Sequence, residues 1–268
     1  MSSAPRIRPI IHPITDPADP VLDPWRDVFG GADGRTVHVD KGLRARGYFV
    51  AEGDTVVRRL LQSDFDVRAV LAKATKVEAL RDVLRGEVFQ ASQADMRVIT
   101  GYDFHRGALA VGTATLPPVP ATLDGWVVAL SGINDPENLG ALIRIAAAFG
   151  CSAVVLDDAC HDPFYRRVIR VSMGHIFHLP VYASADLPGW IARQTGPTFA
   201  ADLRADAVEL RSLAPVGAGV IVLGSEFAGV PERVADACDH RVMIPMAGGV
   251  DSLNVSIAGA VFLHWLKV

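Results

Sequence analysis

The chain has 268 residues, of which half are hydrophobic and 21% are charged, so its composition is that of a packed globular protein and excludes a disordered one. This length suits one large domain or two ordinary ones. The net charge of −4 does not by itself indicate nucleic acid as a partner. Residues 1–115 carry 16 basic and 15 acidic side chains, whereas residues 116–268 carry 10 and 15. A polyanion would therefore have to meet local basic patches.

The sequence shows no sign of a membrane segment, a secretion signal or a metal site. The longest apolar run, Val255 to Leu266, is too short to span a bilayer, and the first residues lack the apolar core of a signal peptide. Cys151, Cys160 and Cys238 are odd in number and widely spaced, which favours reduced, mostly buried thiols. No residue set has the spacing of zinc ligands. We therefore expect a cytoplasmic protein with no bound metal and no membrane partner.

The first part of the chain reads as an arm followed by a small α/β domain. Residues 1–35 are rich in Pro, Asp and Gly and predict an arm and a loop, with one short helix near 25–29. Residues 36–115 form the predicted small domain, because strands and helices alternate there. The run 47–53 is expected to be a strand that ends in a tight turn, and the other expected strands are 67–72, 87–91 and 108–112. One expected helix begins at Asp54, and the others span 76–84 and 93–99. Lys41, Arg44 and Arg46 form a basic cluster that fits a solvated loop as well as a binding surface.

A proline-rich spacer divides the chain. Residues 116–122 include Pro117, Pro118 and Pro120, which make a semi-rigid linker and the clearest domain boundary. Residues 123–268 form the second predicted domain. Its expected strands lie near 126–130, 153–156, 179–182, 198–200, 219–223 and 241–245. Several are apolar throughout, as are strands covered on both faces, so we expect a mostly parallel sheet.

The stretch from Asn134 to Gly150 follows the first of these strands. Asp135 and Pro136 predict a helix start, as N-cap and first-turn proline, and Gly150 predicts its end. Arg144 is the only charged residue between Asn138 and Phe149. An isolated arginine among small and apolar residues is either held by a partner or presented to a ligand. The stretch alone fits a ligand-binding turn and a packed core helix equally well.

Two further loops follow strands and carry unusual polar residues. In the first, residues 223–231, Glu226 lies between two glycines; in the second, residues 244–256, Ser252, Asn254 and Ser256 interrupt an apolar helix start. Ligands in parallel sheets bind beyond the carboxyl ends of the strands, so both loops are candidates. Helix capping would also place Ser and Asn there. Neither loop has the spacing of a nucleotide-phosphate cradle.

Taken together, the three blocks resemble the signature motifs of the SpoU (TrmH) family of RNA ribose 2′-O-methyltransferases, in the SPOUT class. The first motif is Asn138-x-Gly140-x-x-x-Arg144, the second ends at Glu226, and the third is Ile-Pro-Met followed by residues 252–256. Residues 170–174 resemble an intermediate segment of that family. Residues 47–53 and 105–110 resemble the small N-terminal substrate-binding domain of many members, which is similar to a ribosomal protein.

The resemblance implies a parallel-sheet SPOUT domain with a trefoil knot, S-adenosylmethionine as cofactor, RNA as partner (rRNA more than tRNA) and a homodimer with sites at its interface. A face of small residues at 140, 141, 147 and 148 would let a second helix approach. The implied catalytic residues are Asn138, Arg144, Glu226, Ser252 and Asn254. The implied cofactor-binding residues are Leu223, Gly224, Ser225, Glu226, Ile244, Met246, Ser252, Leu253 and Asn254. The expected RNA-binding residues are Lys41, Arg44, Arg46, Arg106, Arg144 and Arg170.

A guanidinium stays protonated in proteins, so we expect Arg144 to grip a phosphate rather than act as a base, with Asn138 orienting the ribose. RNA selection is expected to rest on the N-terminal domain, with Arg58 and Arg59 as further contacts and Arg166, Arg167 and Arg170 grouped with Arg144. Deleting residues 1–115 should then leave cofactor binding intact.

Two alternatives compete with the enzyme. A non-catalytic RNA-binding relative would lack a motif residue, and a nicotinamide-dependent enzyme would need a glycine fingerprint that the chain does not contain.

Overall fold

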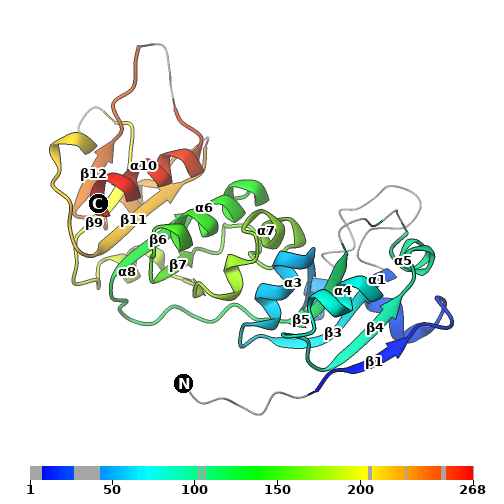
Figure 1. Ribbon diagram of the computed structural model, residues 1–268. Coiled ribbons are helices and arrows are strands. Elements are labelled where there is room, and N and C mark those ends of the chain that lie inside the picture. The colour runs from blue at the N-terminus through cyan, green and yellow to red at the C-terminus, as the bar shows by residue number, and fades with distance from the viewer. Residues whose placement is uncertain are drawn as a thin grey trace. The chain divides into compact units, whose positions relative to one another are not determined.

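The computed structural model describes residues 8–26, 43–101, 104, 107–204, 207–226, 228–248 and 252–267. Two compact units make up the chain (Figure 1). The N-terminal unit comprises Met1–Thr115 together with Phe164–His178, and the C-terminal unit comprises Leu116–Pro163 together with Leu179–Val268. The boundary after Thr115 coincides with the start of the proline-rich spacer. The return of residues 164–178 to the N-terminal unit was not expected from the sequence.

The N-terminal unit is built on a mixed five-stranded sheet in the order β1-β4-β3-β5-β2. β1 and β3 run parallel to β4, while β5 runs antiparallel to β3 and β2. The strands are β1 (Ile10–Pro13), β2 (Tyr48–Glu52), β3 (Asp66–Lys73), β4 (Glu87–Ala91) and β5 (Ala108–Thr113). The helices are η1 (Pro20–Leu22), α1 (Asp23–Arg26), α3 (Asp54–Leu61), α4 (Ala74–Ala79), α5 (Gln93–Thr100), α7 (Arg166–Val171) and η2 (His175–Phe177).

Two predictions for this unit differ from the structure. The expected arm contains the edge strand β1, and Leu22 and Trp25 after it are buried in the core of the unit. A four-residue strand that ends in proline and pairs through its backbone leaves little periodic signal. The helix expected over 76–84 is α4, which already ends at Ala79. By contrast, α5 begins as its sequence suggests, because Ser92 and Asp95 form a capping box.

The C-terminal unit contains a seven-stranded sheet in the order β10-β12-β9-β11-β6-β7-β8, and every pairing in it is parallel. This confirms the predicted parallel sheet. The strands are β6 (Trp126–Ser131), β7 (Ala153–Leu156), β8 (Val181–Ala183), β9 (Thr198–Ala201), β10 (Val208–Glu209), β11 (Gly219–Gly224) and β12 (His240–Met243). β10, which has two residues, was not predicted. The helices are α6 (Pro136–Ala148), α8 (Leu187–Ile191), α9 (Glu232–Ala235), η3 (Leu210–Ser212) and α10 (Val255–Lys267).

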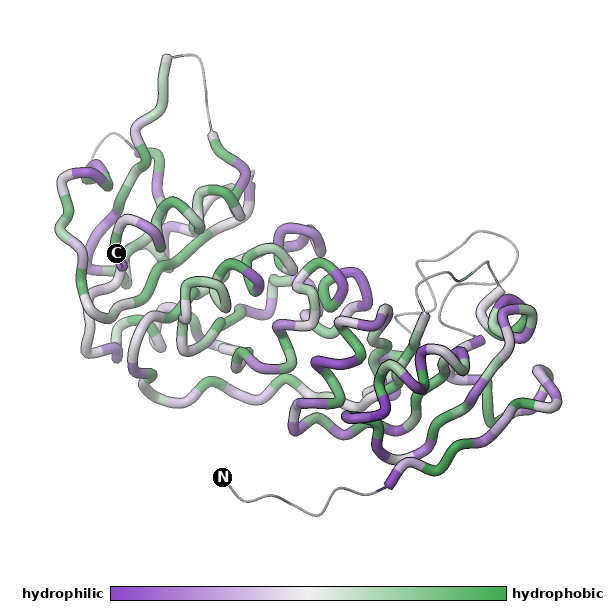
Figure 2. Tube along the Cα trace, viewed as in Figure 1, coloured by the Kyte–Doolittle hydropathy of each residue, from purple (hydrophilic) through white to green (hydrophobic). Residues whose placement is uncertain are grey.

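Helices cover both faces of this sheet, which explains its apolar strands. All residues of β6, β7 and β11 are buried. On one face, α8 and α9 share a hydrophobic core with alternate residues of β6, β7 and β11. α10 packs on α6 and β11, and the hydrophobic colouring in Figure 2 follows α10 and β11. A Cβ atom on Gly259 would lie 2.8 Å from Leu142 and 2.9 Å from Leu223, so glycine lets α10 seat this closely.

Among the described residues, no helix is long and apolar enough to cross a membrane. Cys151, Cys160 and Cys238 are free thiols. Burial raises the pKa of Cys151 to about 11 and, helped by nearby carboxylates, raises the pKa values of Cys160 and Cys238 to about 12.

We expect these raised pKa values to make all three thiols resistant to alkylation in the native protein. A pKa above the working pH leaves the thiol protonated, and the thiolate is the reactive form. Iodoacetamide at pH 8 should therefore react slowly with native protein and rapidly after unfolding in urea, and the native rate should rise about tenfold per pH unit up to pH 10. Equal rates in buffer and in urea at pH 8 would contradict this expectation.

Candidate functional site

The predicted site loops lie along one edge of the C-terminal sheet. β12, β9, β11 and β6 are consecutive in the sheet and parallel, so their carboxyl ends share one edge. After β6, the next two strands in the chain, β7 and β8, lie on one side of it in the sheet. The chain then crosses to the other side of β6, where β9 pairs with the far edge of β11. Such a reversal of strand order is where open α/β sheets bind ligands.

The start of α6 is built as its sequence predicts. Asp135 is the N-cap, and its Oδ1 accepts hydrogen bonds from the backbone N–H groups of Glu137 (2.6 Å) and Asn138 (3.1 Å). Pro136 occupies the first helical position, where its missing N–H costs nothing. This cap places Asn138 in the first turn, where it is only 9% exposed.

Asn138, Glu226 and Asn254, one from each motif, form a hydrogen-bonded polar triad. The Asn138 amide donates to Glu226 Oε1. The Asn254 amide donates to Asn138 Oδ1 at 2.9 Å and to Glu226 Oε1 at 3.3 Å. Three loops that are far apart in the sequence are thus joined through their side chains.

Asn254 also begins α10. Its Oδ1 accepts from the backbone N–H groups of Ser256 (3.0 Å) and Ile257 (3.4 Å) and from the Ser256 hydroxyl (2.5 Å). Because the oxygen is committed to the helix, the Nδ2 group is held toward Asn138 and Glu226. One side chain therefore fixes both the helix start and the polar triad.

This double role predicts different results for two substitutions. Asn254→Ala removes the cap and the triad contacts, and should lower the free energy of unfolding by about 1 kcal/mol as well as slow the methyl transfer that the sequence resemblance implies. Asn254→Ser can still cap the helix but has no amide donor, so it should regain most of the stability and little of the activity. Thermal melting and a turnover assay measure the two effects. Wild-type turnover in Asn254→Ser would show that the amide contacts are dispensable.

A cavity of about 380 Å³ lies beside the triad. This volume is within the range of small-molecule and cofactor sites. Eight predicted cofactor residues line it: Leu223, Gly224, Ser225, Glu226, Ile244, Met246, Ser252 and Leu253. Asn254, the ninth, is joined to the site through Glu226. Sequence reasoning missed the other lining residues, which are Ala201, Asp202, Leu203, Arg204, Ala228, Gly229, Val230, Val255, Ala258 and Phe262.

The cavity has the chemistry of a site for a nucleoside cofactor. Its walls are largely aliphatic, with Phe262 at one side, and Ser225, Ser252 and the carboxylates of Asp202 and Glu226 supply the polar groups. Gly224 ends β11 where the chain turns back on itself, and a Cβ atom there would collide with the backbone of Gly229 and Val230. The residues present therefore fit an apolar base with a polar sugar and tail.

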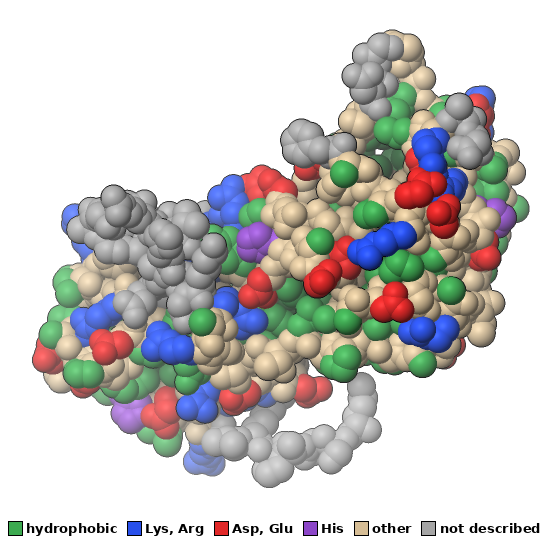
Figure 3. Space-filling view, turned by 180° about the vertical axis from the view of Figure 1, so that it is seen from behind, with side chains coloured by type: hydrophobic (Ala, Val, Ile, Leu, Met, Phe, Trp, Pro, Cys, Tyr) green, Lys and Arg blue, Asp and Glu red, His purple; other side chains and the backbone are tan. Residues whose placement is uncertain are grey.

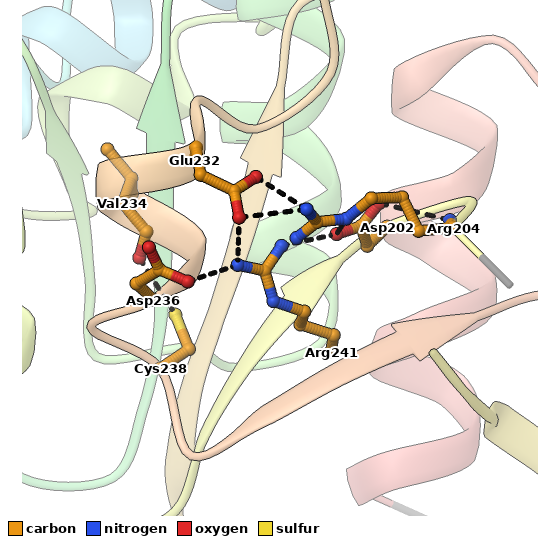
Figure 4. A network of polar contacts seen from close by, with 7 residues as sticks. All are labelled: Asp202, Arg204, Glu232, Val234, Asp236, Cys238 and Arg241. Atoms are coloured by element: carbon orange, nitrogen blue, oxygen red, sulfur yellow. Dashed lines mark hydrogen bonds and ion pairs between the residues drawn. The ribbon is translucent and has the colours of Figure 1, made fainter. Parts of the chain in front are cut away.

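One wall of the cavity is held by a network of paired charges (Figure 4). Asp202 Oδ2 accepts from Arg204 Nε at 3.0 Å and from Arg241 Nη1 at 2.8 Å. Glu232 accepts from both arginines, and Arg241 also donates to Asp236. The network ties the end of β9 to α9 and β12. In the sequence, only the position of residues 201–204 after a predicted parallel strand could have indicated that they line the cavity.

Arg144 lies on α6 and is exposed. Within the described part of the chain, no carboxylate or carbonyl group binds its guanidinium. Of the two possibilities left open by the sequence, the structure therefore favours presentation to a ligand. Ser252 is likewise exposed and lines the cavity.

Several of the arginines expected to contact RNA also make contacts within the N-terminal unit. Arg44 donates to the carbonyl oxygens of Tyr48 (3.1 Å) and Ala114 (3.4 Å), and its guanidinium lies 5.1 Å from the centre of the Phe164 ring. Arg58 pairs with Asp82 at 2.7 Å, and Arg59 donates to Met173 O at 2.5 Å. These guanidiniums make contacts within the fold, which charge clustering in a sequence does not reveal.

The remaining basic candidates are divided between the two units. Arg144 belongs to the C-terminal unit, whereas Arg166, Arg167 and Arg170 belong to the N-terminal unit. Arg166 lies 3.8 Å from the buried carboxylate of Glu52. On the face seen in Figure 3, Lys and Arg side chains are interspersed with Asp and Glu. Arg46 is exposed, while Lys41 and Arg106 lie outside the described residues.

A parallel sheet whose motif loops meet beside a largely aliphatic, cofactor-sized cavity with a few polar groups defines a cofactor-dependent α/β enzyme. The family model described as "SpoU rRNA Methylase family" matches residues 125–264. The chain belongs to this family, which confirms the resemblance seen in the sequence. The nicotinamide-dependent alternative is thereby set aside.

Relatives match along nearly the whole chain. The chain is 33% identical to an uncharacterized tRNA/rRNA methyltransferase of Mycobacterium tuberculosis, over 95% of this chain and 91% of the relative. It is 26% identical to the 23S rRNA (guanosine(2553)-2′-O)-methyltransferase RlmP of Bacillus subtilis, over 88% and 94%.

Among solved structures, an AdoMet-bound rRNA methyltransferase from Sinorhizobium meliloti matches with a TM-score of 0.78 at 27% identity, covering 94% of this chain and 96% of that one. A putative TrmH-family RNA methyltransferase from Porphyromonas gingivalis gives 0.77 at 27% identity, covering 92% and 96%.

Proposed function

We propose that the protein transfers a methyl group from S-adenosylmethionine to a ribose 2′-hydroxyl in a structured RNA, more readily rRNA than tRNA. The observation that carries this proposal is the polar triad, which joins the three family motifs beside a cofactor-sized cavity. The named activity of the Bacillus subtilis relative supports the ribose as acceptor and rRNA as substrate.

S-adenosylmethionine fits the cavity described above. Leu223, Ile244, Met246 and Leu253 would flank its adenine, and the backbone around Gly224 would approach it closely because no side chain intervenes. When bound, the cofactor supplies an electrophilic sulfonium methyl group. Every other requirement of the reaction falls on the protein's own residues.

Those residues must hold the ribose in line and stabilise the negative charge that develops on its 2′-oxygen as the hydroxyl proton passes to water. Asn138 is fixed on both sides, since it donates to Glu226 and accepts from Asn254, so its amide is a rigid group for orienting a ribose. Arg144 is unpaired within the described residues, so its guanidinium can hold the phosphate next to the reacting hydroxyl. Ser252 extends the polar wall.

We further propose that a second copy of the chain covers an apolar groove between α6 and α10. Its lining includes Ile145 and Phe149 from α6, with Ile257 and Val261 from α10. Ile257 is 55% exposed and Val261 is 37% exposed, and contiguous exposed patches of this kind mark interfaces. Arg144 precedes Ile145, so the dimer would bring a partner close to the reacting groups. Of the small residues expected to admit that partner, Gly140 is already buried within its own chain.

The trefoil knot, the cytoplasmic location and the ribosomal-protein likeness of the N-terminal domain stay predictions.

Incubation with methyl-labelled S-adenosylmethionine and total RNA tests the proposed reaction. The label should appear in rRNA, and nuclease digestion should release it as a 2′-O-methylated nucleoside. Label on a base would contradict the ribose as acceptor, and label in tRNA alone would contradict the preference for rRNA. Cofactor binding without transfer to any RNA would identify a non-catalytic relative.

Chelators should leave the activity unchanged, because the methyl group on the sulfonium is already electrophilic and its transfer needs no Lewis acid. Turnover should be equal with and without EDTA, on RNA that has been shown to remain folded. Loss of activity that zinc restores would contradict this expectation.

A further inference from the structure

A second cavity, of about 500 Å³, lies within the N-terminal unit. Four neighbouring strands, β2, β5, β3 and β4, contribute one side of it, and the stretch that contains η1 and α1 contributes another. Figure 1 shows this sheet with α1 beside it. The residues that line the cavity are Val21, Asp23, Pro24, Trp25, Leu43, Arg46, Tyr48, Arg68, Ala69, Glu87, Phe89 and Val111.

An aromatic group with an unpaired donor lines this cavity. Trp25, Tyr48 and Phe89 supply three rings, and those of Trp25 and Phe89 lie edge to face at 5.5 Å. Trp25 is only 1% exposed, and its indole Nε1 has no hydrogen-bond partner among the described residues. A buried N–H without an acceptor is costly to a fold, and a tryptophan is kept where its N–H can reach a partner. The donor therefore points to an acceptor supplied by a ligand.

The uncompensated charge at the cavity is positive. Arg46 and Arg68 both line it, and neither has a partner within the part of the chain that is described. The two carboxylates there are already engaged: Asp23 accepts from Arg26 Nε at 3.0 Å, and Glu87 lies 2.5 Å from His12 Nε2. The cavity thus offers two unused guanidiniums to an anion.

A β-bulge turns Arg68 toward this cavity. Val67 pairs with Gly112 and Ala69 with Val111, so Arg68 is the extra residue in β3. Successive residues of a regular strand point to opposite faces, yet Arg68 and Ala69 both line the cavity. Bulges re-aim side chains in this way and are frequent beside functional sites.

We propose that this cavity binds one unstacked nucleotide of the substrate RNA. The base lies against the aromatic rings and accepts a hydrogen bond from the Trp25 N–H, and Arg46 and Arg68 bind the adjoining phosphate. Proteins recognise single-stranded RNA in this manner, by stacking on aromatic rings and by arginine contacts to the backbone. This inference rests on the proposed function, which supplies RNA as the partner. It assigns to the N-terminal unit a nucleotide subsite separate from the three motif loops.

The test is binding of a fluorescein-labelled, mixed-sequence 20-nucleotide RNA to the full-length protein across a salt series. Arg46→Ala with Arg68→Ala should weaken binding about tenfold or more and reduce the log–log salt slope by about 0.7, the value for one phosphate contact. Arg97→Ala is the control, because Arg97 is an exposed arginine of the same unit outside the cavity. Trp25→Phe keeps a ring but removes the donor and should weaken binding several-fold without changing the slope. Circular dichroism verifies the fold of each variant.

Equal binding by the double-arginine variant and Arg97→Ala would overturn the subsite. Wild-type affinity in Trp25→Phe would overturn the base contact. A 4-thiouridine-substituted RNA should cross-link to Trp25, Tyr48 or Phe89, and cross-links confined to other residues would contradict the placement. Uridine monophosphate at millimolar concentration should not displace the RNA; full displacement would identify a free nucleotide as the ligand. Methyl transfer by the wild-type protein is assayed in parallel to keep the two proposals apart. If the wild-type protein transfers methyl groups to RNA while the variants bind RNA with unchanged affinity, the subsite alone is rejected.

Discussion

Arg144→Ala is expected to lower methyl transfer by about two orders of magnitude, the usual loss for a group that stabilises charge in the transition state. The variant should keep its fold, because the guanidinium is exposed and forms no hydrogen bond or ion pair within the described part of the chain. Binding of S-adenosylmethionine should also persist, since Arg144 does not line the cofactor cavity.

Single-turnover transfer to rRNA, calorimetric titration with S-adenosylmethionine and thermal melting separate these effects. Arg193→Ala is a matched control, because Arg193 is another exposed arginine of the C-terminal unit that lies away from the motif loops. Near-wild-type turnover in Arg144→Ala would remove the residue from the reaction. A loss shared equally by Arg193→Ala would indicate a general charge effect instead.

Deleting residues 1–115 is expected to destabilise the rest of the chain, whereas the sequence alone predicted that cofactor binding would survive. Phe164 and Phe177, in the segment 164–178, are buried and pack on Phe49, with ring centres 5.7 and 5.4 Å away. The deletion removes Phe49 and its neighbours and leaves both rings in water. Uncovering one phenylalanine costs about 2 kcal/mol, and Val168, Ile169 and Ile176 are buried in the same segment.

The fragment 116–268 should aggregate or bind a hydrophobic dye, and should show no cooperative melting. The same fragment carrying Phe164→Ser and Phe177→Ser tests the cause, because removing the exposed rings should improve its solubility. A fragment without these changes that melts cooperatively and binds S-adenosylmethionine with full-length affinity would contradict the prediction.

The sequence predicted the elements whose pattern is strong and local. β6, β7 and β11 are buried on both faces and read as unbroken apolar runs, and Asp135-Pro136 marks the start of α6. β1 and β10 were missed because short edge strands depend on backbone pairing with distant partners.

The candidate site was predicted through its motifs, while its contacts required the fold. The residues Asn138, Glu226 and Asn254 were chosen by resemblance, but their mutual hydrogen bonds span up to 116 positions. Asp202 and Arg241 carry no motif and pair across 39 positions. Arg44 was chosen because it lies in a basic cluster, and the sequence did not reveal that its guanidinium binds a backbone carbonyl and faces the Phe164 ring.

The assembly of the N-terminal unit from two separate stretches sets an order for folding during synthesis. Residues 1–115 leave the ribosome first, yet Phe49 and Phe65 lack the covering segment until residues 164–178 have also emerged. Domains of multidomain chains generally fold as units from the N-terminus onward. Here the N-terminal unit must wait until β6, α6 and β7 have been translated, and until then the nascent chain carries an uncovered aromatic surface.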